Sequence, residues 1–267
     1  MTTSAQHKHG TLLSAPIADE LPHILCNVPK RQLFVLTDSH SAKHCLRMLG
    51  LSIGDIPYHL LTIEAGEKSK TLSSVQVIWD FLFQHGATRQ ALLINLGGGM
   101  ITDLGGFAAA TYMRGISFLN IPTTLLAMVD ASSGGKTGIN YQGVKNGIGT
   151  FTAPLATLIY PPFLQTLPPS EWLSGYAEML KHGLIMNAKH WHELLAYDLL
   201  TTTPALPQLM FLLNDTIRIK QQIVEADFRE QGLRRILNFG HTIGHAIEES
   251  YAEQGRHVPH GYCVMWG

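Results

Sequence analysis

Apolar runs and amphipathic periods alternate through the first 160 residues. Three short runs, rich in β-branched and large apolar residues, predict buried strands at 32–38, 91–96 and 116–121. A period of about 3.6 in the apolar residues predicts a helix over 73–85, and a second helix, rich in small residues, is expected over 103–113. Strands and helices in this order predict βαβ units and a parallel sheet.

The pattern changes after about Tyr160, where two proline pairs interrupt the chain. Beyond them β-rich runs almost vanish, and helical periods predict helices at 170–196, 205–228 and 240–253. The expected fold is an α/β N-terminal domain with a Rossmann-like parallel sheet, followed by an all-α domain. We expect these domains to span 1–160 and 161–267.

The composition limits which classes of binding partner and which cellular location we expect. The 267 residues are 45% apolar and 15% charged, with a formal net charge of −1, so the charge gives no reason to expect nucleic acid or an anionic membrane. Three cysteines without a C-x-x-C pair favour a reducing compartment. Residues 1–10 lack the apolar core of a secretory signal, and no apolar run reaches the roughly 18 residues of a membrane helix. A cytoplasmic protein is expected.

Two candidate ligand sites follow predicted strands. Gly97, Gly98 and Gly99 stand between a strand and a helix, where helix N–H groups favour phosphate. The spacing is not G-x-G-x-x-G, so a tight turn and a pyrophosphate site both remain open. Thr123 and Thr124 follow the next strand, where a helix cap competes with a ligand contact.

A third motif runs from Asp130 to Lys136 and is followed by Lys145 and Asn146. It ends in G-K-T, but the spacing of a P-loop fails, so ATP is not favoured. Two lysines among glycines suit an anion, and a solvated loop is the alternative.

Charged and metal-ligating residues gather in the second half. Glu178 and Lys181 share a predicted helix face, either as a surface pair or as a buried site that needs a partner. His241 and His245 lie four residues apart, with His257 and His260 downstream. This pair, one later histidine and a carboxylate from elsewhere would suit zinc. Thr242 replaces the glutamate of H-E-x-x-H, so a zinc protease is not expected.

These segments together resemble the 3-dehydroquinate synthase family. The resemblance extends from about residue 30 to the end. It rests on GGGMITDLGGFAAATYMRG (97–115), IPTTLLAMVDASSGGKTGIN (121–140), VKN (144–146), GYAEMLKHG (175–183), EQGLRRILNFGHTIGHAIE (230–248) and HG (260–261).

The resemblance implies roles at matching positions. The implied metal ligands are Glu178, His241 and His260, for zinc or cobalt. The implied NAD residues are Asp38, Glu67, Lys70, Gly98, Gly99, Asp103, Thr123 and Thr124. Substrate-binding residues would be Arg114, Lys145, Lys220, Arg234 and Asn238, and catalytic ones Lys136, Lys181, His245, Asp130 and Asn146. His245 would then serve the substrate or proton transfer and not the metal.

The implied substrate is 3-deoxy-D-arabino-heptulosonate 7-phosphate, a sugar phosphate of the shikimate pathway, converted to 3-dehydroquinate and phosphate. The implied steps are oxidation by NAD, phosphate elimination, re-reduction and aldol closure, so the enzyme is a lyase. We expect a homodimer. We also expect NAD across the strand ends at Asp38, Leu96 and Ile121, and one pocket between the domains lined by Lys136, Lys145, Lys181, Lys220 and Arg234.

Two departures qualify the resemblance. Tyr262 stands where the family usually has Glu, and the family continues for several more helices, including a late lysine at the substrate phosphate. We therefore expect a chain shortened at its C-terminus and poorly active alone. Related sugar-phosphate cyclases, metal-dependent polyol dehydrogenases and a catalytically dead binding protein are the alternatives.

Overall fold

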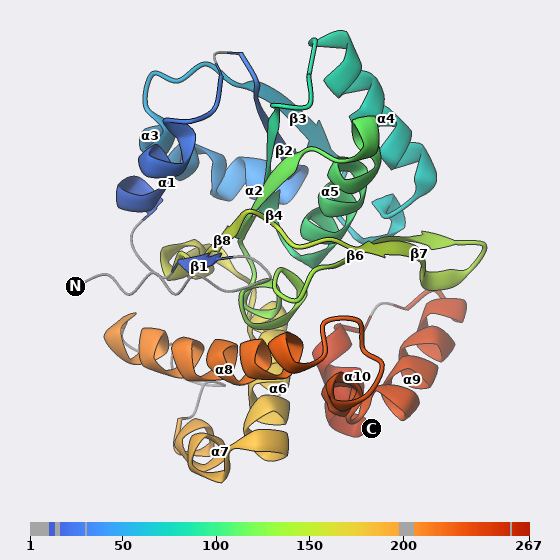
Figure 1. Ribbon diagram of the computed structural model, residues 1–267. Coiled ribbons are helices and arrows are strands. Elements are labelled where there is room, and N and C mark those ends of the chain that lie inside the picture. Colours follow the sequence, from blue (N-terminus) through green and yellow to red (C-terminus); the bar gives the residue numbers. More distant parts are fainter. Residues whose placement is uncertain (1–10, 14–16, 30, 198–205, 257) are drawn as a thin grey trace. The chain divides into compact units, whose positions relative to one another are not determined.

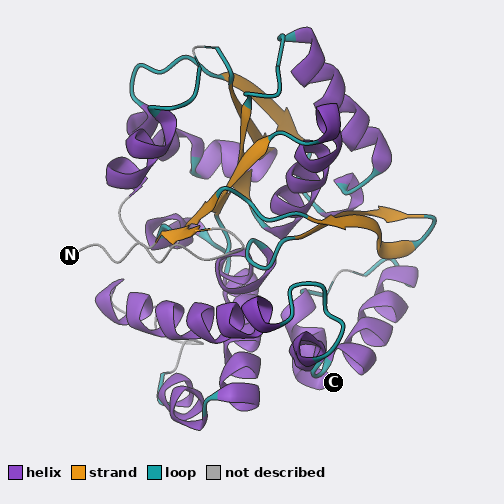
Figure 2. Cartoon of the chain, in the orientation of Figure 1, coloured by secondary structure: helices purple, strands orange, loops and turns teal. Residues whose placement is uncertain are grey.

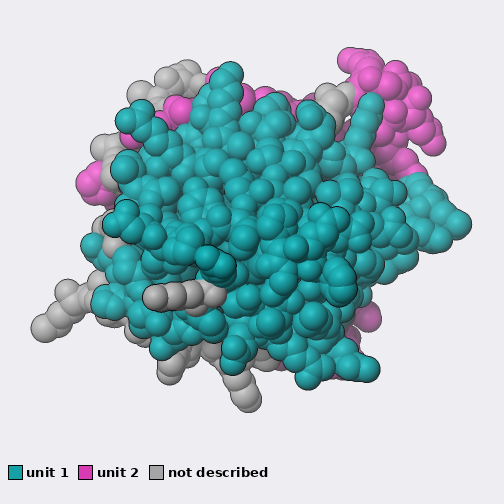
Figure 3. Space-filling model, turned by 90° about the horizontal axis from the view of Figure 1, so that it is seen from above, with its two compact units in different colours: residues 1–123, 131–163 teal, residues 124–130, 164–267 magenta. Residues whose placement is uncertain are grey.

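The computed structural model describes residues 11–13, 17–29, 31–197, 206–256 and 258–267. The predictions about residues 1–10 therefore lie outside the described residues. The chain divides into two compact units, coloured separately in Figure 3: unit 1 comprises residues 1–123 and 131–163, and unit 2 comprises residues 124–130 and 164–267.

A parallel sheet of six strands forms the centre of unit 1, in the order β1-β8-β5-β4-β2-β3 (Figure 1). Its strands are β1 (Thr11–Leu13), β2 (Leu33–Asp38), β3 (His59–Ile63), β4 (Leu92–Gly97), β5 (Ser117–Pro122) and β8 (Ala156–Leu158). β2 and β4 are buried at every position, as expected for central strands of a parallel sheet covered on both faces.

Helices lie on both faces of this sheet (Figure 2), and they alternate with its strands along the chain. The helices of unit 1 are α1 (Ile17–Leu25), α2 (Ser39–His44), α3 (Leu46–Ile53), α4 (Leu72–Gln84) and α5 (Gly99–Thr111), with short turns η1 (Glu67–Ser69) and η2 (Tyr112–Arg114). α4 and α5 pack on one face around Phe34, Leu93 and Leu104. α5 approaches the sheet closely, because a Cβ on Gly105 would lie 2.0 Å from Asn95 Oδ1.

The predicted start of the second helix at Asp103 is wrong. α5 begins four residues earlier, at Gly99, with Gly98 as its N-cap. The glycines around residue 98 disfavour a helix by propensity, yet they allow the close packing seen here, since a Cβ on Gly97 would lie 2.6 Å from Ile101. Asp103 therefore lies in the second turn of α5.

The lysine-containing segment after residue 135 forms an antiparallel hairpin of β6 (Lys136–Tyr141) and β7 (Val144–Phe151). The segment is therefore not the solvated loop that the sequence left open as the alternative to an anion site. Gln142 and Gly143, with φ of 47° and 81°, make the two-residue turn that matches the twist of a hairpin.

Every regular element in the described residues of unit 2 is a helix. Two short helices are shared with unit 1: η3 (Ala127–Ala131) ends one residue beyond unit 2, and η4 (Pro161–Thr166) begins in unit 1. The others are α6 (Pro169–Met186), α7 (Ala188–Leu195), α8 (Leu206–Ala226), η5 (Leu233–Asn238), α9 (His241–Glu253) and α10 (His260–Trp266). The run predicted as one helix over 170–196 is two, because Asn187 leaves helical geometry and its side chain caps α7. In the described part of the chain, no helix has the length and apolar character to cross a membrane.

Two close helix contacts organise unit 2. α10 packs on both α6 and α9. A Cβ on Gly261 would lie 2.2 Å from the Ser174 carbonyl oxygen of α6, and one on Gly244 would lie 2.8 Å from the Cys263 carbonyl oxygen. Glycine at these positions lets three helix backbones approach one another, and this contact sets where His260 begins α10.

Candidate active site

Three neighbouring parallel strands of unit 1 end at one edge of the sheet. β2, β4 and β5 are in register there, with Gly97 paired to Pro122. Asp38, Gly98 and Thr123 stand at these ends. Ligands of open α/β sheets bind outside this edge, so the geometry suits a nucleotide.

A hydrogen-bond network fixes this edge. Asp38 Oδ1 accepts the backbone N–H groups of His40 and Ser41, each at 2.9 Å, and Asp38 Oδ2 lies 3.1 Å from the Ser41 hydroxyl. The same hydroxyl lies 3.2 Å from that of Thr123. Two residues predicted to contact NAD are thus joined through a buried serine that sequence reasoning missed.

The glycine turn leads into α5, whose first turn has no side-chain cap. A Cβ on Gly99 would lie 3.0 Å from that of Ala131. Close packing therefore requires small residues at this turn, and the uncapped N–H groups of the helix are suited to an anion. The tight turn and the phosphate site are compatible readings of the same geometry.

Lys70 joins two other predicted site residues in unit 1. Its side chain is buried, and its Nζ lies 2.5 Å from Asp103 Oδ2 and 2.5 Å from Asn146 Oδ1. Nearby, Glu67 Oε1 accepts a hydrogen bond of 2.8 Å from Asn140. Residues expected at the nucleotide are thereby linked to the β6–β7 hairpin, which carries Asn146.

The other predicted residues of unit 1 are exposed. Arg114 ends η2 with a φ of 68°, and Lys136 and Lys145 lie on the hairpin strands. Thr124 belongs to unit 2, where its hydroxyl accepts the N–H of Ala127. The pocket predicted to gather Lys136 and Lys145 with cations of unit 2 stays a prediction.

Glu178 is the centre of the candidate metal site in unit 2. Its side chain is fully buried in α6, and its Oε1 lies 3.9 Å from Nε2 of His241 and 3.9 Å from Nε2 of His260. Lys181 donates a hydrogen bond to the other oxygen, Oε2. Oε1 has no hydrogen-bond partner. A buried carboxylate oxygen without a partner destabilises the fold unless a cation binds to it.

The outer ring nitrogens of these histidines are held by the protein. His241 Nδ1 lies 3.2 Å from the Phe239 carbonyl oxygen, and His260 Nδ1 lies 3.1 Å from Glu248 Oε2. Such partners orient metal-binding histidines and leave the other nitrogen for the ion. Ligands at about 2.1 Å from a tetrahedral zinc stand roughly 3.4 Å apart, close to the 3.9 Å found here. The donor set therefore fits a divalent metal.

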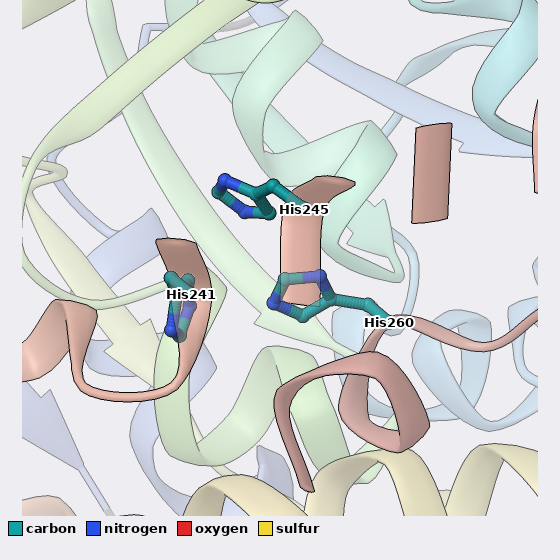
Figure 4. Close-up of side chains that lie close together, drawn as sticks. All are labelled: His241, His245 and His260. Carbon is teal, nitrogen blue, oxygen red and sulfur yellow. The ribbon is translucent and has the colours of Figure 1, made fainter. Parts of the chain in front are cut away.

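His245 lies beside this set. Figure 4 shows the rings of His241, His245 and His260 gathered around a common space, with ring centroids 5.1 to 5.6 Å apart. One ring nitrogen from each lies within 4.8 Å of the others. The geometry thus offers two ligand sets, one with Glu178 and one with His245.

Burial keeps His241 of the candidate metal site neutral. Burial, reinforced by the Lys181 charge, lowers the pKa of His241 to about 4. Burial also raises the pKa of Glu178, against the attraction of Lys181. A neutral imidazole is the form that binds a metal, and a bound cation would return Glu178 to its ionised form.

A second charge network lies beside Glu178. Asp130 Oδ1 lies 2.5 Å from Lys220 Nζ and 3.7 Å from His182 Nε2. Burial alone would raise the pKa of Asp130, but Lys220, Lys181 and His182 hold it well below its usual range. Burial lowers the pKa of Lys220, while Asp130 opposes the shift. An ionised acid and a lysine thus stand together next to the metal site.

Arg234 and Asn238 lie on the η5 segment. Arg234 is buried and its Nη1 donates to the Phe228 carbonyl oxygen at 2.5 Å. Asn238 donates a 2.7 Å hydrogen bond to Glu230 and lines an open hollow with Arg229 and Arg235. The carboxylate of Glu230 also lines this hollow, so its two arginines leave it a single net positive charge.

Sequence reasoning missed two polar residues of this unit. Glu248 orients His260, and its signal was present, because it lies seven residues after His241 and therefore on the same face of α9. His182 is fully buried and neither ring nitrogen has a hydrogen-bond partner, and burial and the Lys181 charge lower its pKa to about 3. The sequence predicted a role for the neighbouring Lys181 but none for His182.

Comparison with known proteins decides the family. Residues 60–174 match the family described as 3-dehydroquinate synthase N-terminal, and residues 175–267 match 3-dehydroquinate synthase C-terminal. A 3-dehydroquinate synthase of Parabacteroides distasonis is 44% identical over 255 residues, which are 94% of this chain and 70% of that protein. The chain belongs to the 3-dehydroquinate synthase family. It spans between 52% and 71% of the length of several curated relatives with the same description.

Solved structures of related synthases share the fold. 2-epi-5-epi-valiolone synthase from Streptomyces hygroscopicus, with NAD+ and Zn2+ bound, is 27% identical with a TM-score of 0.86, covering 99% of this chain and 74% of that one. 2-deoxy-scyllo-inosose synthase, complexed with carbaglucose-6-phosphate, NAD+ and Co2+, is 27% identical with a TM-score of 0.82, covering 96% and 71%. The predicted combination of a parallel sheet and a helical C-terminal part, in the 3-dehydroquinate synthase fold, is confirmed.

Proposed function

We propose that this chain acts as a 3-dehydroquinate synthase, converting 3-deoxy-D-arabino-heptulosonate 7-phosphate to 3-dehydroquinate and phosphate with NAD and a divalent metal, zinc or cobalt. The family supports the reaction, and the cofactors named for the related synthase structures support NAD and the metal. The observation that carries the proposal is the buried, unpartnered Oε1 of Glu178, which faces Nε2 of both His241 and His260.

Glu178, His241 and His260 are the proposed metal ligands. Both histidines direct Nε2 toward Glu178 while their Nδ1 atoms are held, whereas His245 is exposed on α9. A set of three protein ligands leaves a coordination position for substrate, as in catalytic zinc sites. Leaving Glu178 out of the set would bury its oxygen without a partner.

When bound, the metal supplies polarisation of a substrate hydroxyl, and NAD supplies an acceptor and donor of hydride. The chain's own residues bind and orient the substrate. Lys181, Lys220 and Arg234 are proposed to hold its carboxylate and phosphate, because cations with rigid partners lose little side-chain entropy on binding. Asn238 and His245 are proposed contacts to substrate, with His245, the exposed imidazole of the cluster, moving a proton.

Asp130 is proposed to act beside the substrate as an ionised acid. Its low pKa keeps it charged at neutral pH, where it positions the Lys220 ammonium through their hydrogen bond. Lys136, Lys145, Asn146 and Arg114 are proposed substrate residues contributed by unit 1.

NAD is proposed to bind at the carboxyl edge of the unit 1 sheet. Asp38 and Thr123 are held there through Ser41, and the uncapped start of α5 at Gly98 and Gly99 suits the pyrophosphate. Glu67, Lys70, Asp103 and Thr124 complete the proposed set. Accordingly, residues 1–160 would form the NAD domain and 161–267 the metal and substrate domain. A homodimer in the cytoplasm, where its three free cysteines stay reduced, completes the proposal.

A related cyclase reaction is the second candidate, since one structural neighbour is complexed with a sugar phosphate that differs from the heptulosonate. Arg234 and Lys220 favour a substrate that carries a carboxylate as well as a phosphate. Both are buried cations on the metal-bearing unit, and a neutral sugar phosphate needs fewer of them.

The test is phosphate release from the heptulosonate phosphate, with and without a chelator and with heptose 7-phosphate or glucose 6-phosphate as alternatives. The proposal predicts release from the heptulosonate that stops with chelator and returns with zinc. The control is Glu171→Gln, a carboxylate in the first turn of α6. Chelator-insensitive release, or preference for glucose 6-phosphate, would contradict the proposal.

A further inference from the structure

A second cluster of metal-ligating groups lies away from Glu178, where α7 meets α8. One ring nitrogen of His190 and one carboxylate oxygen each of Glu193 and Asp215 lie within 4.8 Å of one another. His190 and Glu193 are three residues apart on α7 and so share a face, and Asp215 lies on α8. The proposed reaction uses none of the three.

Hydrogen bonding fixes which nitrogen of His190 is available. The Thr216 hydroxyl donates to the Leu212 carbonyl oxygen at 2.9 Å, so its lone pairs accept from His190 Nε2, 2.8 Å away. A neutral imidazole protonated at Nε2 carries its free lone pair on Nδ1. The side chain is fully buried, and Nδ1 has no hydrogen-bond partner.

This lone pair faces a carboxylate instead of a donor. Nδ1 lies 3.9 Å from Glu193 Oε2, and burial lowers the pKa of His190, against the pull of Asp215 and Glu193, which keeps the ring neutral. Two acceptors directed at one another repel unless a cation lies between them. The arrangement is therefore incomplete without a positive ion.

The cations that now pair with the carboxylates are displaceable. Glu193 Oε1 lies 3.5 Å from Lys189 Nζ, and Asp215 Oδ1 lies 2.8 Å from Arg218 Nη2, but those side chains are 82% and 65% exposed. Exposed ion pairs of this kind contribute little to stability. If the lysine and the arginine left the carboxylates, both cations would remain in contact with water. A divalent ion could replace both.

We propose that His190, Glu193 and Asp215 bind a second divalent transition-metal ion, of the zinc class, that ties α7 to α8. One imidazole and two carboxylates are ligands that zinc accepts, and two carboxylates balance its charge. The carboxylates need to move about 1 Å to reach the spacing of a tetrahedral site, which partly exposed side chains can do. The chain would then hold a structural ion separate from the catalytic one.

The experiment counts zinc ions per chain by equilibrium dialysis and mass spectrometry of the whole protein. Two ions are expected in the unchanged chain, and one should persist in Glu178→Gln. Glu193→Gln and Asp215→Asn should each lower the affinity for the second ion. The loss should exceed the roughly 10- to 100-fold that follows when a residue that only orients a metal ligand is removed. Arg218→Ala, which removes a competitor, should tighten it.

Glu171→Gln is the matched control and should leave both ions in place. Circular dichroism checks that each variant is folded, and these partly exposed carboxylates are substituted by isosteric amides, which limits damage. The proposal is overturned if folded Glu193→Gln and Asp215→Asn bind zinc with unchanged number and affinity, or if anomalous diffraction places no ion at His190 Nδ1.

Discussion

Replacing Gly261 by alanine tests how the backbone contact between α10 and α6 positions the proposed metal ligand His260. A Cβ at this position would lie 2.2 Å from the Ser174 carbonyl oxygen and 2.5 Å from its Cα, whereas ordinary contact begins near 3.4 Å. Both neighbouring atoms are backbone, so no side chain can rotate away. α10 must move from α6 by about 1 Å, and His260, the first residue of α10, moves with it.

The free-energy cost follows from two terms. Overpacking of this kind costs about 1–3 kcal/mol. The 2.9 Å hydrogen bond from the Gly261 N–H to the Ser174 hydroxyl is lost as well, at about 0.5–1.5 kcal/mol. A total of roughly 1.5–4.5 kcal/mol should lower Tm by about 5–15 °C. A displaced His260 also leaves the ±0.2 Å tolerance of metal bonds, so zinc affinity should fall.

The assay is thermal unfolding with and without zinc, together with a zinc titration. Gly50→Ala is the control, because a Cβ there meets nothing within 4 Å in α3, and it should gain about 0.5–1 kcal/mol. Ser174→Ala removes the hydrogen bond without the clash, so its Tm should lie between those of Gly261→Ala and Gly50→Ala. If Gly261→Ala keeps both the Tm and the zinc affinity of the unchanged chain, α10 does not lie against α6 as described.

Three further perturbations have defined outcomes. Glu248→Ala removes the carboxylate that orients His260 and should weaken zinc about 10- to 100-fold in a titration. Lys70→Met removes the hydrogen bonds to Asp103 and Asn146 and should lower the free energy of unfolding in urea by about 1.5–3 kcal/mol. The same variant should bind NAD more weakly in calorimetry. Without metal, the free energy of unfolding should fall as pH drops from 6.5 toward 4. The reason is that His241 has a pKa of about 4 in the folded chain, so between pH 6.5 and 4 the unfolded chain binds a proton there and the folded chain does not.

Neighbouring residues supply the controls. Glu249→Ala, an exposed carboxylate on the same helix, should leave zinc binding unchanged, and Lys68→Met should leave NAD binding unchanged. Equal losses in each control and its test variant would show a general charge effect. Apo stability that is flat or rising as the pH falls would contradict the buried, neutral state of His241.

Strong periodic patterns predicted the core of the fold. The runs at 32–38, 91–96 and 116–121 are β2, β4 and β5, the three strands at whose ends we propose that NAD binds. They were readable because strands buried on both faces are continuously apolar. The edge strand β3 was missed, because its side chains alternate only between partly buried and exposed.

The missed elements depend on contacts that spacing does not show. The β6–β7 hairpin was hidden by its glycines, yet a Cβ on Gly149 would lie 2.3 Å from the Thr137 carbonyl oxygen, so the strands need glycine to approach. The break at Asn187 was hidden within a helical period. A capping asparagine resembles an ordinary polar position until its hydrogen bond to the His190 N–H is seen.

The candidate site was predictable in its residue types but not in its partners. Spacing identified the histidines, and family resemblance selected Glu178. That Glu178 is fully buried and that Glu248 holds His260 required the packing of α6, α9 and α10. Burial of a charged group depends on all its neighbours at once, which no local pattern contains.

Zinc affinity of two variants tests the central claim most directly. The measurement is made in a chain that also carries Asp215→Asn, so that the second proposed ion does not contribute. The account predicts that Glu178→Gln loses high-affinity zinc while His245→Gln keeps it, with circular dichroism showing both folded. Zinc retained in Glu178→Gln and lost in His245→Gln would contradict it and assign the metal to the three histidines.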